Sequence, residues 1–433
     1  MSIESLTPAP SVRDETTLDG PARHTSGLFS PLRQSRNFTA LWLGQSLSQF
    51  GDSVLWVTLP LAVFHTSNST VQLGIIMGLF MLPQVVLLPF TGILADRISR
   101  IKAMMVTDVV RLLLVVVLAM LYVARLMDTR ILGVFVLMYG AMEAVFNPAY
   151  SAARQQVFTP EIRSAAISLT QITIQSARLL GPALGGALVG LATPAAGFLL
   201  DALMLLASVV SLLFLRIPPP QKDSALLQGT GMRGYFHELL GGYHELRKHP
   251  WLWITIVAFA FLSIASAGLA TILVPWLVKV HLHLSDFTYG LVSSASGVGA
   301  IAAAFVYSRK RQWGHRAYLA YGGLAANALA LFGLTFAHTT WMLMAIMAVA
   351  SAGSMMFGVV WEGSMQELVA PEAYGRAASL DYFGSWVLLP VGNVLIGWLA
   401  SRVGGIHTVW AASLFMVMIT VITMSVPAVR RVN

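Results

Sequence analysis

Twelve long apolar segments constrain what this chain can fold into more than any other feature. A helix needs about 20 mostly apolar residues to cross the hydrocarbon core of a bilayer. Only 11% of the residues are charged, whereas a soluble globular domain carries about 25%. The sequence therefore predicts an all-α membrane protein with twelve transmembrane helices, at about residues 38–63, 72–95, 103–124, 131–157, 163–191, 195–216, 251–278, 286–308, 316–337, 340–366, 373–400 and 406–428.

The polar segments divide these helices into two groups of six. Residues 1–35 have no apolar run and predict a disordered cytoplasmic tail. Residues 36–216 and 251–433 each hold six spans and predict two six-helix bundles. The linker 217–250 between them has apolar and charged residues at helical spacing over 234–248. We expect an amphipathic helix on the inner membrane surface there; a solvated linker helix is the alternative.

The positions of the basic residues predict the orientation of the chain. Of the 27 Lys and Arg residues, 21 lie on the side of the membrane that holds the N-terminus, 4 lie in the opposite loops, and Arg111 and Arg178 lie within spans. Cytoplasmic loops carry such an excess. We therefore expect both termini in the cytoplasm and a multi-pass protein of the plasma membrane. The same asymmetry explains the pI of about 9.9 without a nucleic-acid partner.

The two halves of the chain repeat one another. The segment Gln155–Leu169 around Pro160 matches the segment around Pro371 at an offset of 211 residues, and Gly186 falls on Gly397 at the same offset. Six spans followed by six spans in the same orientation indicate a parallel duplication. A substrate route would then lie between the halves, near the bilayer midplane.

Three motifs connect this pattern with a known family. The segment 92–102, which contains Gly92, Asp96, Arg97 and Arg100, resembles the loop G-x-L-A-D-R-x-G-R-[RK], with Ser99 and Ile101 as departures. The segment 177–186 resembles the antiporter motif G-x-x-x-G-P-x-x-G-G through Gly181, Pro182, Gly185 and Gly186, with Ala177 in place of the first Gly. The third motif combines Gly51-Asp52, the segment 146–149 and the segment 247–250.

Together these motifs resemble the major facilitator superfamily, and within it the branch of the enterobactin exporter and the macrolide efflux proteins. The resemblance covers about residues 36–430. It implies two pseudo-symmetric six-helix bundles and transport by alternating access. One departure matters: many drug/proton antiporters carry an Arg in span four, and this span four carries Glu143 instead. The proton route therefore cannot be transferred from those relatives.

The loop between spans two and three predicts a gate. A carboxylate near a helix N-terminus is stabilised by roughly 0.3–1 kcal/mol. Asp96, with Arg97 and Arg100 beside it, lies at the inner end of span two and faces the region where span eleven begins. We expect Asp96 and Arg100 to hold the inner face closed; the alternative is that the basic residues only set the topology.

Several charged residues lie within the predicted spans. An Asp or Arg at a helix centre costs about 2.5–3.5 kcal/mol on the insertion scale, so few are retained without a partner or a function. We expect Asp52 and Glu143 to carry protons and Arg178 to tune them; the alternative is a static ion pair with Arg178. Asp108 and Arg111, three residues apart, share a helix face and are interpreted as structural. The remaining intramembrane charges are Asp201, Glu362 and Asp381.

The aromatic residues supply candidates for a substrate cavity. Trp56, Tyr139, Trp361 and Trp386 lie within spans and could line a pocket for a bulky apolar ligand; the alternative for each is contact with lipid or another helix. The chain has no cysteine, and it has no zinc-protease, P-loop or nucleophile-elbow motif. We expect no metal, no cofactor and no enzymatic activity, with the proton gradient as the energy source.

The sequence thus predicts a monomeric secondary transporter in the lipid bilayer. It would export amphipathic or cationic small molecules, of the multidrug or macrolide type, in exchange for protons. A siderophore or lysolipid exporter is the alternative within transport. A membrane sensor that binds a ligand without transporting it is the alternative outside transport.

Overall fold

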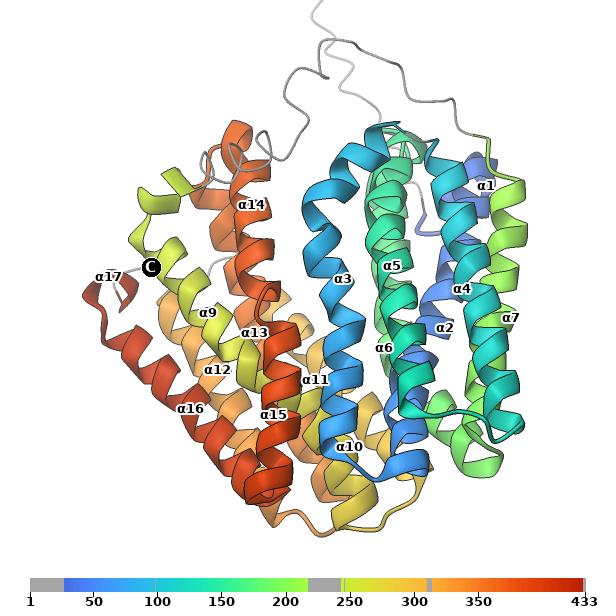
Figure 1. Ribbon diagram of the computed structural model, residues 1–433. Coiled ribbons are helices and arrows are strands. Elements are labelled where there is room, and N and C mark those ends of the chain that lie inside the picture. Colours follow the sequence, from blue (N-terminus) through green and yellow to red (C-terminus); the bar gives the residue numbers. More distant parts are fainter. Residues whose placement is uncertain (1–26, 98, 217–242, 245, 310–313, 431–433) are drawn as a thin grey trace, which may run out of the picture.

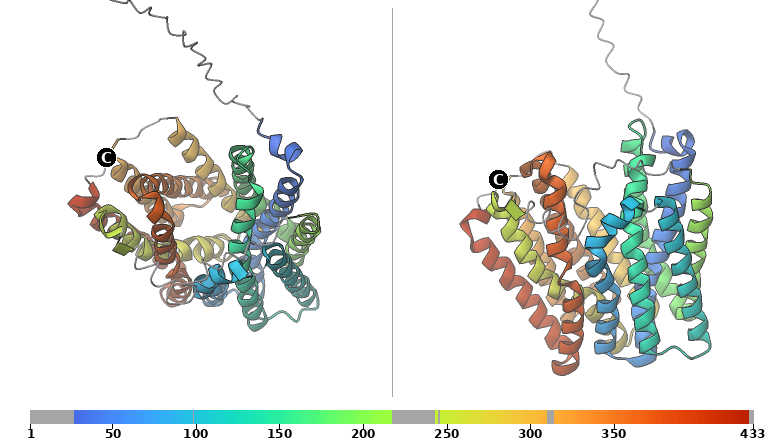
Figure 2. Two further views of the ribbon diagram at one scale, coloured as in Figure 1. Left: turned by 90° about the horizontal axis from the view of Figure 1, so that it is seen from above. Right: turned by 45° about the horizontal axis from the view of Figure 1, so that its top comes forward.

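The computed structural model describes residues 27–97, 99–216, 243–244, 246–309 and 314–430, and all regular structure in these ranges is helical. Figure 1 shows two groups of helices side by side, and the view from above in Figure 2 separates the same groups. We call the group α2–α7 the N-terminal bundle and the group α9–α16 the C-terminal bundle. The N-terminal group comprises α1 Ser30–Gln34, α2 Arg36–Ser67, α3 Thr70–Arg97, α4 Arg100–Val123, α5 Thr129–Val157, α6 Arg163–Leu191 and α7 Pro194–Leu213.

The C-terminal group begins with a continuous helical segment that alternates between α- and π-helix. The segment comprises α9 Pro250–Gly268, η1 Leu269–Leu273, α10 Val274–Trp276 and η2 Leu277–His281, with Pro275 in its irregular part. Since proline has no backbone N–H, it perturbs a helix interior. The other elements are α11 Asp286–Ser308, α12 Arg316–Gly333, η3 Leu334–Phe336, α13 Thr340–Leu368, α14 Pro371–Trp386, α15 Leu389–Val403, α16 Gly405–Ser425 and α17 Pro427–Arg430.

The predicted all-α class is confirmed, and most of the predicted spans coincide with helices that could cross a membrane. Within the described ranges, eleven helices are long and apolar enough to do so. The predicted fifth span coincides with α6, a 29-residue helix that is not among the eleven. Its first half is rich in Ser, Thr and Gln. The helix packs against α2 of its own bundle and α11 of the other.

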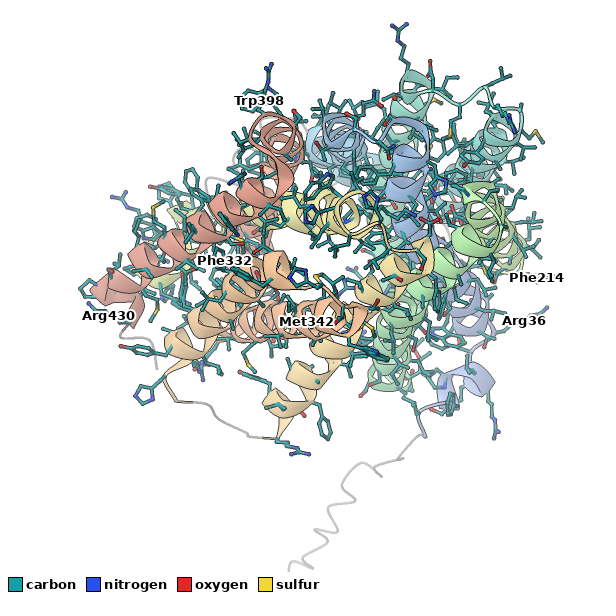
Figure 3. All side chains as sticks on the ribbon, turned by 90° about the horizontal axis from the view of Figure 1, so that it is seen from below. Arg36, Phe214, Phe332, Met342, Trp398 and Arg430 are labelled. Atoms are coloured by element: carbon teal, nitrogen blue, oxygen red, sulfur yellow. The ribbon has the colours of Figure 1, made fainter. Side chains whose placement is uncertain are left out.

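The outer surface of the helices is apolar. On α4, Leu113, Val117 and Met120 are exposed at a spacing of three to four residues, which places them on one face. In the view from below, side chains radiate from both bundles, and Trp398 lies at the rim on α15 (Figure 3). Trp398 is 48% exposed. Such a surface is typical of a protein surrounded by lipid.

The two bundles meet at the lower end in Figure 1, where α2 is joined to α3 and α15 to α16. Two seams of close backbone contact join them. A Cβ atom on Gly186 of α6 would lie 2.7 Å from the Cα of Gly290 on α11, and one on Gly74 of α3 would lie 3.2 Å from the Cα of Gly397 on α15. Only glycine permits this approach. Gly186 and Gly397 are the glycines that the internal repeat pairs, so the duplication produces two equivalent seams.

Candidate functional site

A cluster of acidic side chains surrounds one arginine in the interior of the N-terminal bundle. The guanidinium of Arg111 on α4 is 1% exposed and lies 3.3 Å from Oδ1 of Asp52 on α2. It also forms an ion pair with Asp108, one turn away on the same helix. The Oγ of Ser208 on α7 donates to Oδ2 of Asp108 at 2.7 Å. The i, i+3 spacing of Asp108 and Arg111 thus produces the expected local pair, and the fold adds Asp52 to it.

Tyr139 on α5 extends this cluster to a third aspartate. Its hydroxyl donates to Oδ1 of Asp52 at 2.8 Å and lies 3.5 Å from Oδ2 of Asp201 on α7. Asp201 is fully buried. Because the phenol has a single proton to donate, its contact with Asp201 becomes a second hydrogen bond only when Asp201 is protonated and donates in turn.

Glu143, one turn beyond Tyr139, completes the cluster. Nε2 of Gln84 on α3 donates to its Oε2 at 2.9 Å. Glu143, Asp52 and Trp56 line a void of about 10 Å³, which is close to the smallest space that holds a water molecule. The sequence-predicted pair Asp52 and Glu143 is therefore brought to one small space in the interior.

The charges of this cluster do not balance. We define the acid cluster as Asp52, Asp108, Glu143 and Asp201 around Arg111. Among the described ion pairs, Arg111 is the one basic partner of these four carboxyl groups. Full ionisation would leave three negative charges without a counter-ion, although Asp108 and Asp201 are fully buried and Asp52 and Glu143 are partly buried. Because an uncompensated buried charge is strongly unfavourable, the cluster has the chemistry of a site that holds and exchanges protons.

Arg178, the predicted tuning cation, lies elsewhere. Its side chain is exposed, and no ion pair given for the described residues involves it. Its backbone carbonyl lies at the α6–α11 seam, 3.3 Å from the position of a Cβ on Gly297. The cation beside Asp52 is Arg111, which is fixed from a second direction by the rings of Tyr139 and Phe146, 5.5 and 4.8 Å from its guanidinium.

A larger cavity, which we call the aromatic cavity, lies in the C-terminal bundle. Its volume is about 270 Å³, and it is enclosed by α9, α12, α13, α14 and α16. Two of the predicted substrate residues, Trp361 and Trp386, line it. Of the other two, Trp56 lines the void beside Asp52 and Tyr139 belongs to the acid cluster. The four aromatic residues are thus divided between two sites.

One charged residue lines the aromatic cavity. Asp381 on α14 accepts a hydrogen bond from Nε1 of Trp361 at 3.0 Å and one from Oγ of Ser385 at 3.4 Å. The sequence placed Asp381 within a span but gave it no function, because the contact of α13 with α14 at this point is not visible in the sequence.

The antiporter-type motif in α6 contacts two different helices. Cβ atoms on Gly181 and Gly185 would meet Ser53 and Val54 of α2 within the same bundle, whereas one on Gly186 would meet α11 of the other bundle. Pro182 lies between them, and its carbonyl is 2.5 Å from the position of a Cβ on Gly290. The motif therefore packs α6 closely on both sides.

The predicted gate at the upper end is largely beyond what the structure describes. The side chains of residues 88–98, which include Gly92, Asp96 and Arg97, lie outside the described part of the chain. Nη1 of Arg100 donates to the carbonyl of Ala152 on α5 at 3.3 Å. The contact of Arg100 is thus within its own bundle, and a gate formed by Asp96 stays a prediction.

Charged residues that the sequence analysis did not select join the bundles at the lower end. Asp286, the first residue of α11, lies 3.2 Å from Nε2 of His65 on α2 and 2.5 Å from Nζ of Lys279. Thr70 on α3 adds a hydrogen bond to the carbonyl of Gly397 at 3.1 Å. Residues 65 and 286 are 221 positions apart, so the sequence carries no local signal of this contact.

Comparison with known proteins gives consistent matches over nearly the whole chain. The model of a family described as "Transmembrane secretion effector" matches residues 26–433. The uncharacterized MFS-type transporter YfiS of Bacillus subtilis (strain 168) is 24% identical over 85% of this chain and 88% of its own length. Macrolide efflux protein A of Streptococcus pyogenes is 21% identical over 92% and 97%.

The fold also matches solved transporter structures. A bacterial homolog of the human lysosomal transporter Spinster, in an inward-facing and unoccupied conformation, superposes with a TM-score of 0.71 at 16% identity. The superposition covers 91% of this chain and 96% of that protein.

Proposed function

The chain belongs to the Transmembrane secretion effector family of major facilitator transporters, in the macrolide efflux branch, and on this basis we propose that it exports amphipathic or cationic small molecules in exchange for protons. Membership in this family confirms the predicted superfamily and makes the protein a membrane transporter, not an enzyme. The proposed coupling and substrate class go further; the acid cluster is the observation that supports the coupling, and the aromatic cavity supports the substrate class.

The acid cluster supports proton coupling through its excess of carboxyl groups. Asp52 and Glu143 share a void of the size of one water molecule, and Tyr139 connects Asp52 with Asp201. Protons on this cluster are the most direct way to reduce the uncompensated charge. The cluster would take up protons from the outside and release them to the cytoplasm. This proton movement would drive export with about 2.3 kcal/mol per charge for each 100 mV of membrane potential. Arg111, in place of Arg178, would set how readily they leave.

The two seams at the lower end support alternating access. We assign the lower end in Figure 1 to the outside and both termini to the cytoplasm of a bacterial cell, with all twelve predicted spans, α6 included, crossing the plasma membrane. The described contacts between the bundles then close the outer face, as in an inward-open state. Asp96 and Arg100 would close the inner face in the opposite state. The protein would act as a monomer, with the amphipathic part of the linker 217–250 on the inner surface.

The substrate class is supported by the cavity and by one relative. One relative, macrolide efflux protein A, is named for the export of macrolides. The aromatic cavity has apolar walls and one carboxyl group. Both fit an apolar molecule with a positive charge. They fit a lysolipid or a siderophore less well, because the phosphate of a lysolipid and the oxygen donors of a siderophore would lie near the negative charge of Asp381.

Purified protein in proteoliposomes with an internal pH dye tests this function. Lipophilic cations, macrolides, siderophores and lysolipids would be added one at a time, and substrate-induced proton flux recorded. We expect flux with a cation or a macrolide. Saturable binding without flux of protons or substrate for every compound would refute the proposal and indicate a sensor.

A further inference from the structure

We infer that the aromatic cavity binds a small organic cation with Asp381 as its counter-ion, at a site separate from the proton-exchanging acid cluster. The inference deepens the proposed function: it places the substrate in the C-terminal bundle and the proton in the N-terminal bundle.

The surroundings of Asp381 are those of a carboxyl group without a partner cation. Trp361 and Ser385 donate hydrogen bonds to its two oxygens, and they hold the group in place at the cavity wall. Among the described ion pairs none involves Asp381, and no Lys, Arg or His lines the cavity. A negative charge in such a space is costly unless a counter-ion compensates it. A ligand with a positive charge is therefore the occupant that the site selects.

The walls beside Asp381 add a second preference for cations. Phe357 stacks on Phe259 at 5.2 Å with an interplanar angle of 2°, and on Trp361 at 6.2 Å and 7°. Tyr382 stacks on Trp386 at 5.0 Å on α14. Aromatic faces attract a cation by about 0.5–2 kcal/mol each, more strongly when water is excluded. Five aromatic rings thus line the cavity that holds the single carboxyl group.

The backbone at the cavity is also that of a binding site. The predicted eleventh span is divided into α14 and α15, with a turn at Val387 and Leu388 directly after Trp386. Pro390 explains the break, since its ring excludes the helical position of the carbonyl four residues earlier. Irregular backbone at membrane depth is tolerated where it lines a cavity or is buried in protein. Here Val387 lines a small pocket together with Trp386.

That small pocket connects the two sites. It is lined by Gln84 and Val85 of α3 and by Tyr382, Phe383, Trp386 and Val387 of α14 and the turn that follows. Gln84 also donates to Glu143 of the acid cluster. Tyr382 and Trp386 belong to the wall of the aromatic cavity. A change at Glu143 would therefore reach the cavity through a single side chain, which permits coupling of substrate and proton without competition for one carboxylate.

The size of the cavity defines the probe. At about 270 Å³ it is slightly below the range of roughly 300–1,000 Å³ for ligand pockets, so a compact molecule is appropriate. Benzyltrimethylammonium combines one aromatic ring with a permanent positive charge. Neopentylbenzene has the same shape and no charge. Binding of each to the purified full-length protein would be measured by calorimetry in detergent, without any gradient.

The variants separate the charge of Asp381 from general effects. We expect the wild-type protein to bind benzyltrimethylammonium at least tenfold more tightly than neopentylbenzene. Asp381→Asn should abolish this difference and Asp381→Glu should retain most of it. Glu362→Gln is the matched control, because Glu362 on α13 is exposed, bonds to Tyr374 and Gln366, and does not line the cavity.

Three results would overturn the inference: wild-type protein that does not prefer the cation, Asp381→Asn with unchanged preference, or an equal loss in Glu362→Gln. A variant that fails to fold would be recognised by loss of binding for the neutral probe as well, and Asp381→Glu then decides. Because the binding assay needs no gradient, cation selectivity without proton flux would sustain this inference and refute the proposed antiport. Proton flux without cation selectivity would do the reverse.

Discussion

Replacing Arg111 with methionine tests the structure of the acid cluster most severely. Arg111→Met removes the partner of Asp108, which is fully buried and would keep only the hydroxyl of Ser208. Removing one partner of a buried ion pair costs about 3–5 kcal/mol, because it leaves the other charge uncompensated. We therefore expect Arg111→Met to lower the free energy of unfolding by about 3–5 kcal/mol.

The free energy would be measured by unfolding the purified protein with SDS in mixed micelles. Arg111→Met with Asp108→Asn should be more stable than Arg111→Met alone, because the double variant has no uncompensated carboxylate at position 108. Arg178→Met is the control, since this intramembrane arginine is exposed and should change the stability by no more than about 0.5 kcal/mol. A double variant no more stable than Arg111→Met alone, or equal losses for Arg111→Met and Arg178→Met, would refute the reasoning.

Three further predictions concern the opening of the two faces. All three are measured in a Thr70→Cys background of this cysteine-free chain, where the rate of labelling by a thiol reagent reports how often the lower seam opens. Gly290→Ala should open the lower seam and speed labelling, because the added Cβ meets the carbonyl of Pro182 and overpacking costs about 1–3 kcal/mol. Gly190→Ala is the control and should not speed labelling, because the nearest neighbour of its Cβ is 3.4 Å away. Equal labelling rates for the two variants would contradict the seam. Asp286→Asn should also speed labelling, by about fivefold for a loss of 1 kcal/mol, because it weakens the contacts of Asp286 with His65 and Lys279. Asp128→Asn is the control and should have no effect, because it keeps the N-terminal cap of α5 at the same end of the molecule. A slower labelling rate for Asp286→Asn would argue against the contact. Asp96→Asn should slow labelling during transport, because the state with a closed inner face and an open lower seam would be less populated. Unchanged labelling with unchanged transport would exclude the gate.

The sequence predicted the architecture because lipid imposes simple rules on it. Segment lengths, charge asymmetry and the offset of 211 residues between Gly186 and Gly397 are all visible in one dimension. The fifth span shows where hydropathy alone is insufficient: α6 is polar in its first half, yet it is a 29-residue helix packed against α2 and α11. The break after Trp386 was not expected, although Pro390 is a signal that could have predicted it.

The candidate sites could be predicted only in part. Asp52 and Glu143 were selected because a charge within a span is costly, and the structure places them at one void. Their cation was misassigned to Arg178, because the sequence gives the depth of a residue and not the face of the neighbour that it meets. Arg111 was assigned to Asp108 alone for the same reason. The roles of three further residues arise from contacts between helices, and no local sequence pattern predicts these contacts. The three residues are Asp381, His65 and Asp286.

The most direct test of the central claim separates proton coupling from substrate movement in the same proteoliposomes. Wild-type protein, Asp52→Asn and Glu143→Gln would be compared for uptake of a transported cation driven by a pH gradient, and for exchange of labelled against unlabelled cation without a gradient. We predict that Asp52→Asn loses gradient-driven uptake and retains exchange, with a weaker loss in Glu143→Gln. Gradient-driven uptake at the wild-type level in both variants would contradict the assignment of the proton to the acid cluster.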